Sequence, residues 1–270
     1  MEKKPKILIT NDDGIFSPGL KCLWQSLVEH ADLFIVAPAF DQSGVGVGIT
    51  FRNPLQIDKV KWENDTPAWK VNGTPADCVK LGLSVILKDK PDLIVSGINR
   101  GSNAGRTVLY SGTVGGAIEG ALRNIPGVAF SFEDMEKPDY LIAHDYIYPI
   151  VKHALEHKLP QGTLLNVNFP HTTREFKGIK LARQGRSYWV DTPHERLHPE
   201  GTPYFWLGGK WDDHEEHPES DVALLKEGFI TVVPIHIDEL TDHKHLENRK
   251  ESFEKLFPNS LKSVEGIIQK

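Results

Sequence analysis

Two adjacent carboxylates follow an apolar run near the start of the chain, in the tetrapeptide Asn11-Asp12-Asp13-Gly14. Residues 7–10 predict a buried strand, and in open α/β sheets ligands bind in the crevice beyond the carboxyl ends of the strands. Two like charges ~4 Å apart repel by about 4 kcal/mol at an effective dielectric of about 20, so we expect a cation between them. The alternative is an Asx turn with a helix cap, in which the two side chains point apart and are solvated separately.

Oxygen donors also follow two further apolar runs. Ser43 lies in a glycine-rich loop, where its hydroxyl can approach a cation, and Asn99 offers an amide oxygen. Oxygen ligands suit Mg²⁺, Mn²⁺ or Ca²⁺ and disfavour a tetrahedral zinc site. With only two charged ligands the ion would keep open positions, as a catalytic ion requires. We predict one divalent cation per subunit, Mg²⁺ or Mn²⁺, held by Asp12, Asp13, Ser43 and Asn99.

A polar turn with small residues opens a helix at Tyr110-Ser111-Gly112-Thr113-Val114. The free N–H groups of a first helical turn and the helix dipole favour an anion, and the hydroxyls of Ser111 and Thr113 add donors. Such a segment by itself is more often only a helix cap. Together with the oxygen-rich loops, it favours a phosphate site.

The N-terminal half alternates strand and helix patterns. Ser17 and Pro18 predict one helix start, and Thr74-Pro75-Ala76-Asp77 predicts another. Further strands are predicted at residues 33–36, 92–98 and 128–132. This alternation indicates an α/β fold with a Rossmann-like, doubly wound, mostly parallel sheet.

The C-terminal half is less regular. Helix and strand patterns at 140–157 and 164–169 are followed by a long stretch without sustained periodicity, which we interpret as an extended oligomerisation arm. We predict a single α/β domain over residues 1–270. Its parts are a core at about 1–170 and 226–240, an arm at about 171–225 and a terminal helix at about 244–269.

Composition narrows the class of protein. A formal net charge of −6 without a long basic block argues against binding of nucleic-acid polymers. No apolar run approaches the ~18 residues that a membrane span needs, and residues 1–6 lead into a strand without a signal-peptide pattern, so we expect a cytoplasmic protein. Cys22 and Cys78 lie in predicted helices and are expected to be buried free thiols.

Several motifs of the chain resemble, in order and spacing, those of the stationary-phase survival protein E family of metal-dependent nucleotidases. In the N-terminal half they are Asn11-Asp12-Asp13-Gly14, Gln42-Ser43-Gly44, Gly73-Thr74-Pro75-Ala76-Asp77-Cys78, Ser96-Gly97-Ile98-Asn99 and Tyr110-Ser111-Gly112-Thr113-Val114. In the C-terminal half they include Leu165-Asn166-Val167-Asn168-Phe169-Pro170 and Gln184-Gly185-Arg186. The resemblance covers nearly the whole chain.

The resemblance implies a 5′-nucleotidase, a phosphoric monoester hydrolase that acts on nucleoside monophosphates. Some members of the family also cleave 3′-nucleotides and short polyphosphate. It implies a Rossmann-like core with an arm exchanged within homodimers or homotetramers, and it places the metal ligands on the same four residues, with Asp12, Asp13 and Asn99 as catalytic residues. By motif position, the phosphate pocket is implied to consist of Asn11, Gly44, Asn103, Ser111, Gly112 and Thr113.

The chain departs from the family pattern at two places near the site. Where members usually have Ala-Pro-Asp-Arg, this chain has Ala37-Pro38-Ala39-Phe40, and where an acid usually precedes the tyrosine by three residues it has Thr107, preceded by Arg106. Both changes remove negative charge, whereas the metal set is intact. We hypothesise that Arg106 helps to hold substrate phosphate.

Three other classes of function compete with a phosphatase. A metal-dependent glycosyltransferase would also use paired acids, but it leaves the anion site at Ser111 to Thr113 without a task. A nucleotide-binding regulatory protein could use the same crevice without turnover. A dinucleotide-dependent oxidoreductase is disfavoured, because no Gly-x-Gly-x-x-Gly follows the first predicted strand.

Overall fold

A computed structural model describes residues 4–136 and 138–256 of the 270-residue chain. The chain forms two compact units, Met1–Ile237 and Asp238–Lys270. The second unit contains α6 (His243–Glu254), and the predicted continuation of this helix over 257–269 lies outside the described residues. Within the described ranges, no helix is long and apolar enough to cross a bilayer.

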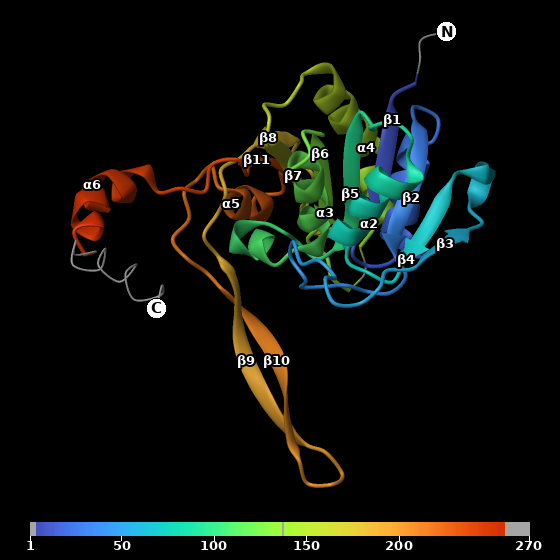
Figure 1. Ribbon diagram of the computed structural model, residues 1–270. Helices are drawn as coiled ribbons and strands as arrows, with labels where there is room; N and C mark the ends of the chain where they lie inside the picture. Colours follow the sequence, from blue (N-terminus) through green and yellow to red (C-terminus); the bar gives the residue numbers. More distant parts are fainter. Residues whose placement is uncertain (1–3, 137, 257–270) are drawn as a thin grey trace, which may run out of the picture. The chain divides into compact units, whose positions relative to one another are not determined.

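The first unit is built on one large mixed sheet (Figure 1). Across the sheet its strands run in the order β3, β4, β2, β1, β5, β6, β7, β11, β8. They are β1 (Lys6–Thr10), β2 (Asp32–Pro38), β3 (Ile57–Val60), β4 (Ala68–Val71), β5 (Leu93–Arg100), β6 (Gly127–Phe132), β7 (Thr163–Phe169), β8 (Ile179–Leu181) and β11 (Ile230–His236). The pairs β3–β4 and β7–β11 are antiparallel, and the other neighbours are parallel.

Helices cover both faces of this sheet. They are α1 (Pro18–Leu27), α2 (Pro75–Leu81), α3 (Gly112–Ala121), α4 (Tyr140–Glu156) and the short α5 (Asp221–Lys226). Helices α1 and α4 pack against each other over one face, and α2 and α3 pack together over the other (Figure 1). The predicted Rossmann-like, doubly wound α/β fold is confirmed.

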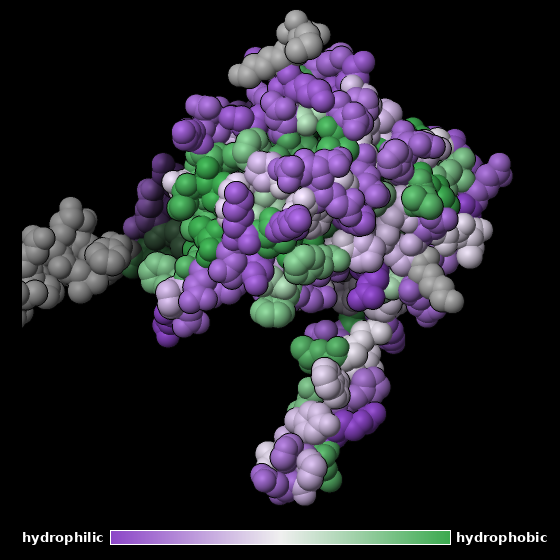
Figure 2. Space-filling model, turned by 90° about the vertical axis from the view of Figure 1, so that its right-hand side faces the viewer, coloured by the Kyte–Doolittle hydropathy of each residue, from purple (hydrophilic) through white to green (hydrophobic). Residues whose placement is uncertain are grey.

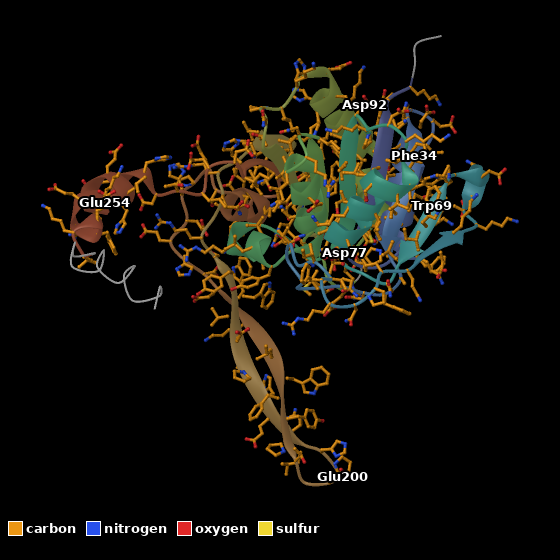
Figure 3. All side chains as sticks on the ribbon, viewed as in Figure 1. Phe34, Trp69, Asp77, Asp92, Glu200 and Glu254 are labelled. Carbon is orange, nitrogen blue, oxygen red and sulfur yellow. The ribbon has the colours of Figure 1, made fainter. Side chains whose placement is uncertain are left out.

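The central strand β1 is buried on both faces. Ile7 and Ile9 belong to the apolar cluster that α1 and α4 cover, whereas Leu8 belongs to the cluster on the α2 side. Phe34 of β2 and Trp69 of β4 pack against this second cluster (Figure 3). Full burial of an aliphatic side chain stabilises the fold by about 1.5–3 kcal/mol, so β1 is strongly held in register.

Side-chain caps start the first two helices where the sequence predicts them. Ser17 Oγ accepts a hydrogen bond from Leu20 N at 3.3 Å, and Pro18 occupies the first turn of α1. At α2, Thr74 and Asp77 form a reciprocal capping box (Figure 3). Both caps satisfy N–H groups that a helix start leaves without partners.

The segment 171–225, predicted to form an arm, contains three kinds of structure. Strand β8 pairs with β11 in the large sheet, and α5 lies against the same part of the unit. Between them, β9 (Tyr188–Leu197) and β10 (Pro203–Asp212) form a separate two-stranded antiparallel hairpin. The hairpin extends away from the large sheet, and apolar side chains are visible along it (Figures 1 and 2).

A buried carboxylate ties the root of this hairpin to the loop between β5 and α3. Asp221 is 0% exposed, and its Oδ2 accepts hydrogen bonds from Gly105 N at 3.0 Å and Gln184 Nε2 at 3.1 Å. Its Oδ1 accepts from Gly185 N and Val222 N, both at 2.8 Å. Burial raises the pKa of this carboxyl to about 6, despite the hydrogen bonds from backbone N–H groups, which lower it.

Strand β5 contains an irregularity just before its polar end. Its pairing with β6 shifts between Ser96 and Asn99, and Gly97 there has φ +130°. A Cβ atom on Gly97 would lie 2.3 Å from the carbonyl oxygen of Phe130. Glycine at this position therefore allows the close approach of the two strands that brings Asn99 to the sheet edge.

We expect Gly97→Ala to lower the free energy of unfolding by roughly 3 kcal/mol or more, because a methyl group would clash with the backbone of β6. Denaturant titration measures this loss. The matched control is Gly178→Ala: Gly178 has φ +122°, but no atom lies within 4 Å of its Cβ position, so it carries only the backbone penalty of about 1 kcal/mol. Equal losses in the two variants would show that the contact with Phe130 is unimportant.

Asp221 should make stability depend on pH in a recognisable way. Its folded-state pKa of about 6 lies above the ordinary value of 3.8, so the folded state binds a proton more tightly than the unfolded state between these values. Stability due to this group is therefore present at low pH and is lost as pH rises from about 4 to about 6. Relative to Asp221→Asn, the wild type should lose roughly 3 kcal/mol over this range.

Denaturant unfolding of both proteins at several pH values between 4 and 7 checks this expectation. Asp213→Asn is the control. Asp213 is exposed, and the hydrogen bond from Lys226 lowers its pKa, so its contribution has the opposite sign and is gained as pH rises. A stability difference between wild type and Asp221→Asn that does not change with pH would contradict the assignment of a buried charge.

Candidate active site

The loops that follow β1, β2 and β5 meet at one edge of the sheet. Strand β1 lies between β2 and β5, and Thr10, its last residue, pairs in register with Ser96. The loop after β2 is joined to the loop after β1 by a hydrogen bond of 2.8 Å from Gln42 N to Asp12 O. The candidate residues of these three loops therefore share the crevice that the sequence predicts.

Asp12 is buried, with 3% of its surface exposed, and it lies against the start of α3. The hydroxyl of Thr113 donates to Asp12 Oδ1, and a Cβ atom on Gly112 would lie 2.9 Å from Asp12 Cβ. Burial raises the pKa of the Asp12 carboxyl to about 7. The charge of Asp13 adds to the rise, and the Thr113 hydrogen bond opposes it. The first turn of α3 is thus in direct contact with the first carboxylate.

Asp13 lies beside the end of β5. Its Oδ2 accepts a hydrogen bond of 3.2 Å from Arg100 N, and burial raises the pKa of its carboxyl above the ordinary value. The helix that follows is capped by Ser17, not by either aspartate. Because Asp12 is buried beside Asp13, the alternative of two separately solvated side chains in a helix cap is excluded.

Asn99 and Ser43 are placed near the carboxylates by their elements. Asn99 Nδ2 donates to Gly101 O at 2.8 Å, which leaves the amide oxygen available to a ligand. Ser43 is exposed on the loop that Gln42 joins to Asp12, and its backbone N–H donates to Asp41 Oδ1 at 2.8 Å. For the part of the chain that is described, no hydrogen bond links the Ser43 hydroxyl to the other three predicted ligands.

The chemistry of these four residues fits a hard divalent cation. In the described ranges, neither carboxylate of the pair forms an ion pair with a Lys, Arg or His side chain. The charge of Arg100 acts on Asp13 from farther away, whereas within these ranges no cation acts on the buried Asp12. The same ranges contain no cluster of three or more His, Cys, Asp or Glu residues that could hold a metal. Any ion at this site would therefore need the hydroxyl and amide oxygens of Ser43 and Asn99 beside the two carboxylates.

The residues predicted to line a phosphate pocket divide into two groups. Ser111 and Thr113 lie at the start of α3, where Ser111 Oγ accepts from Val114 N at 3.1 Å. Asn11 and Asn103 instead use their amide nitrogens inside the protein. Asn11 Nδ2 donates to Gly14 O at 2.9 Å and to Ser17 Oγ at 2.8 Å, and thereby fixes the loop after β1.

Gly44 and Arg106 lie at the surface of this region. Gly44 has φ +76° and open space around its Cβ position. Arg106 is exposed, and its backbone N–H donates to Ser187 O at 3.0 Å, at the root of the β9–β10 hairpin. The loop that carries Arg106 is thus anchored, and its side chain is free to meet a ligand from solvent.

Asn103 and the loop after β5 are held by three buried polar residues for which the sequence predicted no role, Ser131, Asn166 and Asn168. Asn103 N donates to Asn168 Oδ1 at 2.8 Å, Asn166 Nδ2 donates to Asn103 O at 2.9 Å, and Asn103 Nδ2 donates to Ser131 Oγ at 2.6 Å. All four residues are buried. The signal was present in the sequence, because Asn166 and Asn168 are polar residues spaced by two in an otherwise apolar strand.

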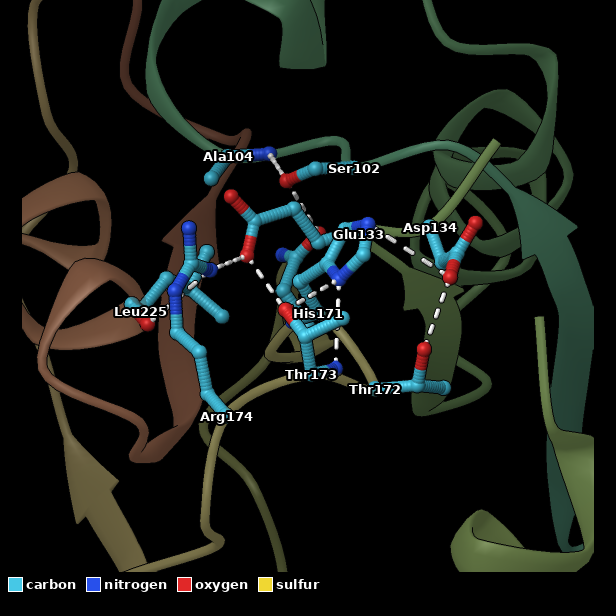
Figure 4. A network of polar contacts seen from close by, with 10 residues as sticks. Ser102, Ala104, Glu133, Asp134, His171, Thr172, Thr173, Arg174 and Leu225 are labelled. Carbon is cyan, nitrogen blue, oxygen red and sulfur yellow. Dashed lines mark hydrogen bonds and ion pairs between the residues drawn. The ribbon is translucent and has the colours of Figure 1, made fainter. Parts of the chain in front are cut away.

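A charged network lies close to this loop, around the same small cavity (Figure 4). Glu133, which follows β6, accepts from Arg174 and from His171 N at 3.0 Å. His171 Nε2 lies 3.5 Å from Asp134 Oδ2. Ser102 lies in the same view and accepts from Ala104 N at 3.1 Å.

Two cavities open near this edge of the sheet. One, of about 580 Å³, has Asp13 in its wall. The other, of about 240 Å³, lies between the loop after β5 and the hairpin root and is lined by Trp189 and Trp211. A larger cavity of about 690 Å³ is lined by Asp92, Pro126 and Gly162, which precede β5, β6 and β7, so it lies at the opposite ends of the strands from the candidate residues.

Comparison with known proteins gives a consistent result. The model of the family described as "Survival protein SurE" matches residues 7–191. The chain is 52% identical over 257 residues to the 5′-nucleotidase SurE of Protochlamydia amoebophila, covering 94% of this chain and 98% of that protein. It is 43% identical to the 5′-nucleotidase SurE of Moorella thermoacetica, covering 88% and 92% of the two chains.

A solved structure agrees with the fold. The crystal structure of the SurE protein from Aquifex aeolicus superposes with a TM-score of 0.77 at 38% identity, covering 92% of this chain and 99% of that one. The family model spans most of the chain, the two relatives match over nearly their full length, and the carboxylate pair, the serine loop and the α3 start lie at one sheet edge. The chain therefore belongs to the SurE family.

Proposed function

We propose that this chain is a divalent-metal-dependent 5′-nucleotidase that hydrolyses nucleoside 5′-monophosphates to a nucleoside and phosphate. The observation that carries the proposal is Asp12, buried without a cationic partner in the described ranges beside the first turn of α3, with the half-buried Asp13 next to it. A cation site next to the N–H groups of a helix start is suited to a phosphate monoester. The names of the SurE relatives support the same activity.

In this proposal Asp12, Asp13, Ser43 and Asn99 hold one Mg²⁺ or Mn²⁺ per subunit. When bound, such an ion supplies positive charge to the phosphoryl group and makes an attacking water more acidic. The chemistry of the donor set and the uncompensated Asp12 charge support this assignment.

The chain's own groups account for the other steps. The N–H of Gly112 at the start of α3 and the hydroxyl of Ser111 bind the phosphoryl oxygens as negative charge shifts onto them, whereas the N–H groups of Thr113 and Val114 are bonded to Asp12 and Ser111. Asp12 or Asp13 accepts the proton of the attacking water. Attack by a carboxylate through an aspartyl-phosphate is the alternative route, and hydrolysis in oxygen-labelled water separates the two.

The wider phosphate pocket is proposed to include Gly44 and Arg106, with Asn11 and Asn103 holding its loops. Arg106→Ala should raise KM for nucleotides if this side chain binds phosphate. Nucleoside 3′-monophosphates and short polyphosphate are further proposed substrates, to be compared with 5′-monophosphates in one panel. We propose the cytoplasm as the location, where the buried free thiols Cys22 and Cys78 would remain reduced.

We expect the purified protein to release phosphate from nucleoside 5′-monophosphates with Mn²⁺ or Mg²⁺ and to lose this activity on chelation. Asp13→Asn should lower kcat by at least about 100-fold, because it removes one of two charged ligands while keeping the side-chain shape. Asp58→Asn, at the exposed edge strand β3, is the matched control and should retain full activity. Nucleotide binding without turnover under every metal tested would instead support the regulatory alternative.

We also propose that the chain forms homodimers or homotetramers through the β9–β10 hairpin. An isolated two-stranded hairpin is marginally stable in water. Four consecutive side chains of β10, Tyr204 to Leu207, are exposed although they alternate between its two faces. Exposed apolar surface of this kind is typical of a protein interface, and a second copy of the chain would cover it.

Charge on both faces of β10 should weaken this assembly. We expect the double variant Phe205→Asp/Trp206→Asp to have a smaller molecular mass than the wild type in light scattering at equal concentration. Glu200→Gln, at the turn of the hairpin, is the control and should leave the mass unchanged (Figure 3). A wild-type protein with the mass of one chain would contradict the proposal.

A further inference from the structure

The cavity of about 580 Å³ is the space into which a nucleotide bound at the candidate site can extend. Its walls come from the loop after β1, the residues after β2, the end of β5 and the start of α4. Asp13 is part of the wall, and so is Arg100, whose N–H is bonded to the Asp13 carboxylate. A volume of this size falls within the range of small-ligand pockets.

Phe16 is an exposed aromatic residue in the wall of this cavity, on a backbone that is firmly held. The residue before it, Ile15, is fully buried and donates its N–H to Pro38 O at 2.8 Å. The residue after it, Ser17, donates its N–H to Gly14 O at 3.0 Å and accepts from Asn11 Nδ2. Between these two anchors, the Phe16 side chain is 72% exposed.

Local packing does not account for the exposed phenyl ring. Exposure of an aromatic surface is unfavourable, and a ring on a rigid loop can bind a flat ligand with little loss of conformational entropy. Phe16 lies three residues beyond Asp13, so a ligand whose phosphate is at the carboxylate pair has the ring within its reach. Nucleobases stack on such aromatic faces whatever their hydrogen-bonding pattern.

We propose that this cavity takes the nucleoside of the substrate and that the nucleobase stacks on Phe16, which makes Phe16 a specificity-determining residue. This inference rests on the proposed function and adds the part of the site that recognises the leaving group. Purines offer a larger stacking face than pyrimidines, so the contribution of Phe16 is greater for AMP and GMP than for CMP and UMP.

The second cavity, of about 240 Å³, is the competing place for the base, because Trp189 and Trp211 in its wall are also aromatic. Its residues include no predicted metal ligand, whereas Asp13 lies directly in the wall of the larger cavity. The structure therefore favours the cavity beside Phe16 as the place of the base. If the base lies there, Phe16→Ala causes the base-dependent rise in KM, and if it lies in the second cavity, Trp189→Ala does.

The test compares substrates with and without a base. Steady-state kinetics with Mn²⁺ are measured for AMP, CMP and ribose 5-phosphate in the wild type, Phe16→Ala and Phe16→Tyr. We expect Phe16→Ala to raise KM for AMP about tenfold more than KM for ribose 5-phosphate, with a smaller difference for CMP. Phe16→Tyr, which keeps the aromatic face, should restore a wild-type KM for AMP.

Two controls make the result specific. Phe51→Ala removes a phenyl ring that is 89% exposed and does not line the cavity, and it should leave all three KM values unchanged. Calorimetric binding of adenosine gives a readout that needs no turnover, and Phe16→Ala should weaken it to the same extent as it raises KM for AMP.

Two outcomes would overturn the inference. In Phe16→Ala the ratio of KM for AMP to KM for ribose 5-phosphate could stay unchanged, or Trp189→Ala could cause the base-dependent loss instead. Failure of the proposed function is distinct from these, because the wild type would then hydrolyse none of the three phosphates. Adenosine binding to wild type and Phe16→Ala would still decide whether the base stacks on Phe16.

Discussion

Asp12 and Asp13 follow a buried strand as two neighbouring carboxylates, and removal of such charges from water costs several kcal/mol per ion. Hydrogen bonds from the surrounding elements offset only part of this desolvation cost. Thr113 donates its hydroxyl to Asp12, and Arg100 donates its backbone N–H to Asp13. Neither contact neutralises the pair, and this is the physical reason for the proposed cation and for the proposed anionic ligand at the adjacent start of α3. The glycine at 112 is required here, since any side chain would occupy the space against Asp12.

Buried polar side chains, together with apolar anchors such as Ile15 and Ala104, hold the loops around this pair. Asn11 fixes the turn after β1, the group around Asn103 fixes the loop after β5, and Asp221 joins that loop to the hairpin root. Loops at a ligand site cannot bury much apolar surface without filling the crevice, and buried hydrogen bonds provide rigidity in a small volume. Two residues implied by family resemblance to line the phosphate pocket, Asn11 and Asn103, thus use their amide nitrogens to position the backbone.

The parts of the fold that the sequence predicts are those governed by local rules. The caps at Ser17 and Thr74, the alternation of strands and helices, and the polar residues at strand ends all follow from short segments. Convergence of the loops at one edge follows from parallel pairing. The partners of Asn166, Asn168 and Asp221 could not be assigned from the sequence, because they lie 63, 65 and 116 residues away.

The β9–β10 hairpin escapes sequence reasoning for a different reason. Alternation of apolar and polar residues arises when one face of a strand is buried, and nearly all of β9 and β10 is exposed on both faces. The sequence therefore shows only an irregular stretch over 171–225. Helix α5, with six residues, is too short to produce a helical repeat that stands out from its surroundings.

Hydrogen bonds join the root of the hairpin to the loop that precedes α3. They connect the exposed hairpin with the loop that carries Arg106, two segments that are far apart in the sequence. Arg106 N donates to Ser187 O, and Gly105 N and Gly185 N donate to the same carboxylate of Asp221. Any contact that orders the root also restricts the backbone that presents Arg106. Because the ordering of a loop before binding reduces the entropy lost on binding, the proposed contact of a second copy with the hairpin and the proposed binding of phosphate would be thermodynamically linked through Asp221.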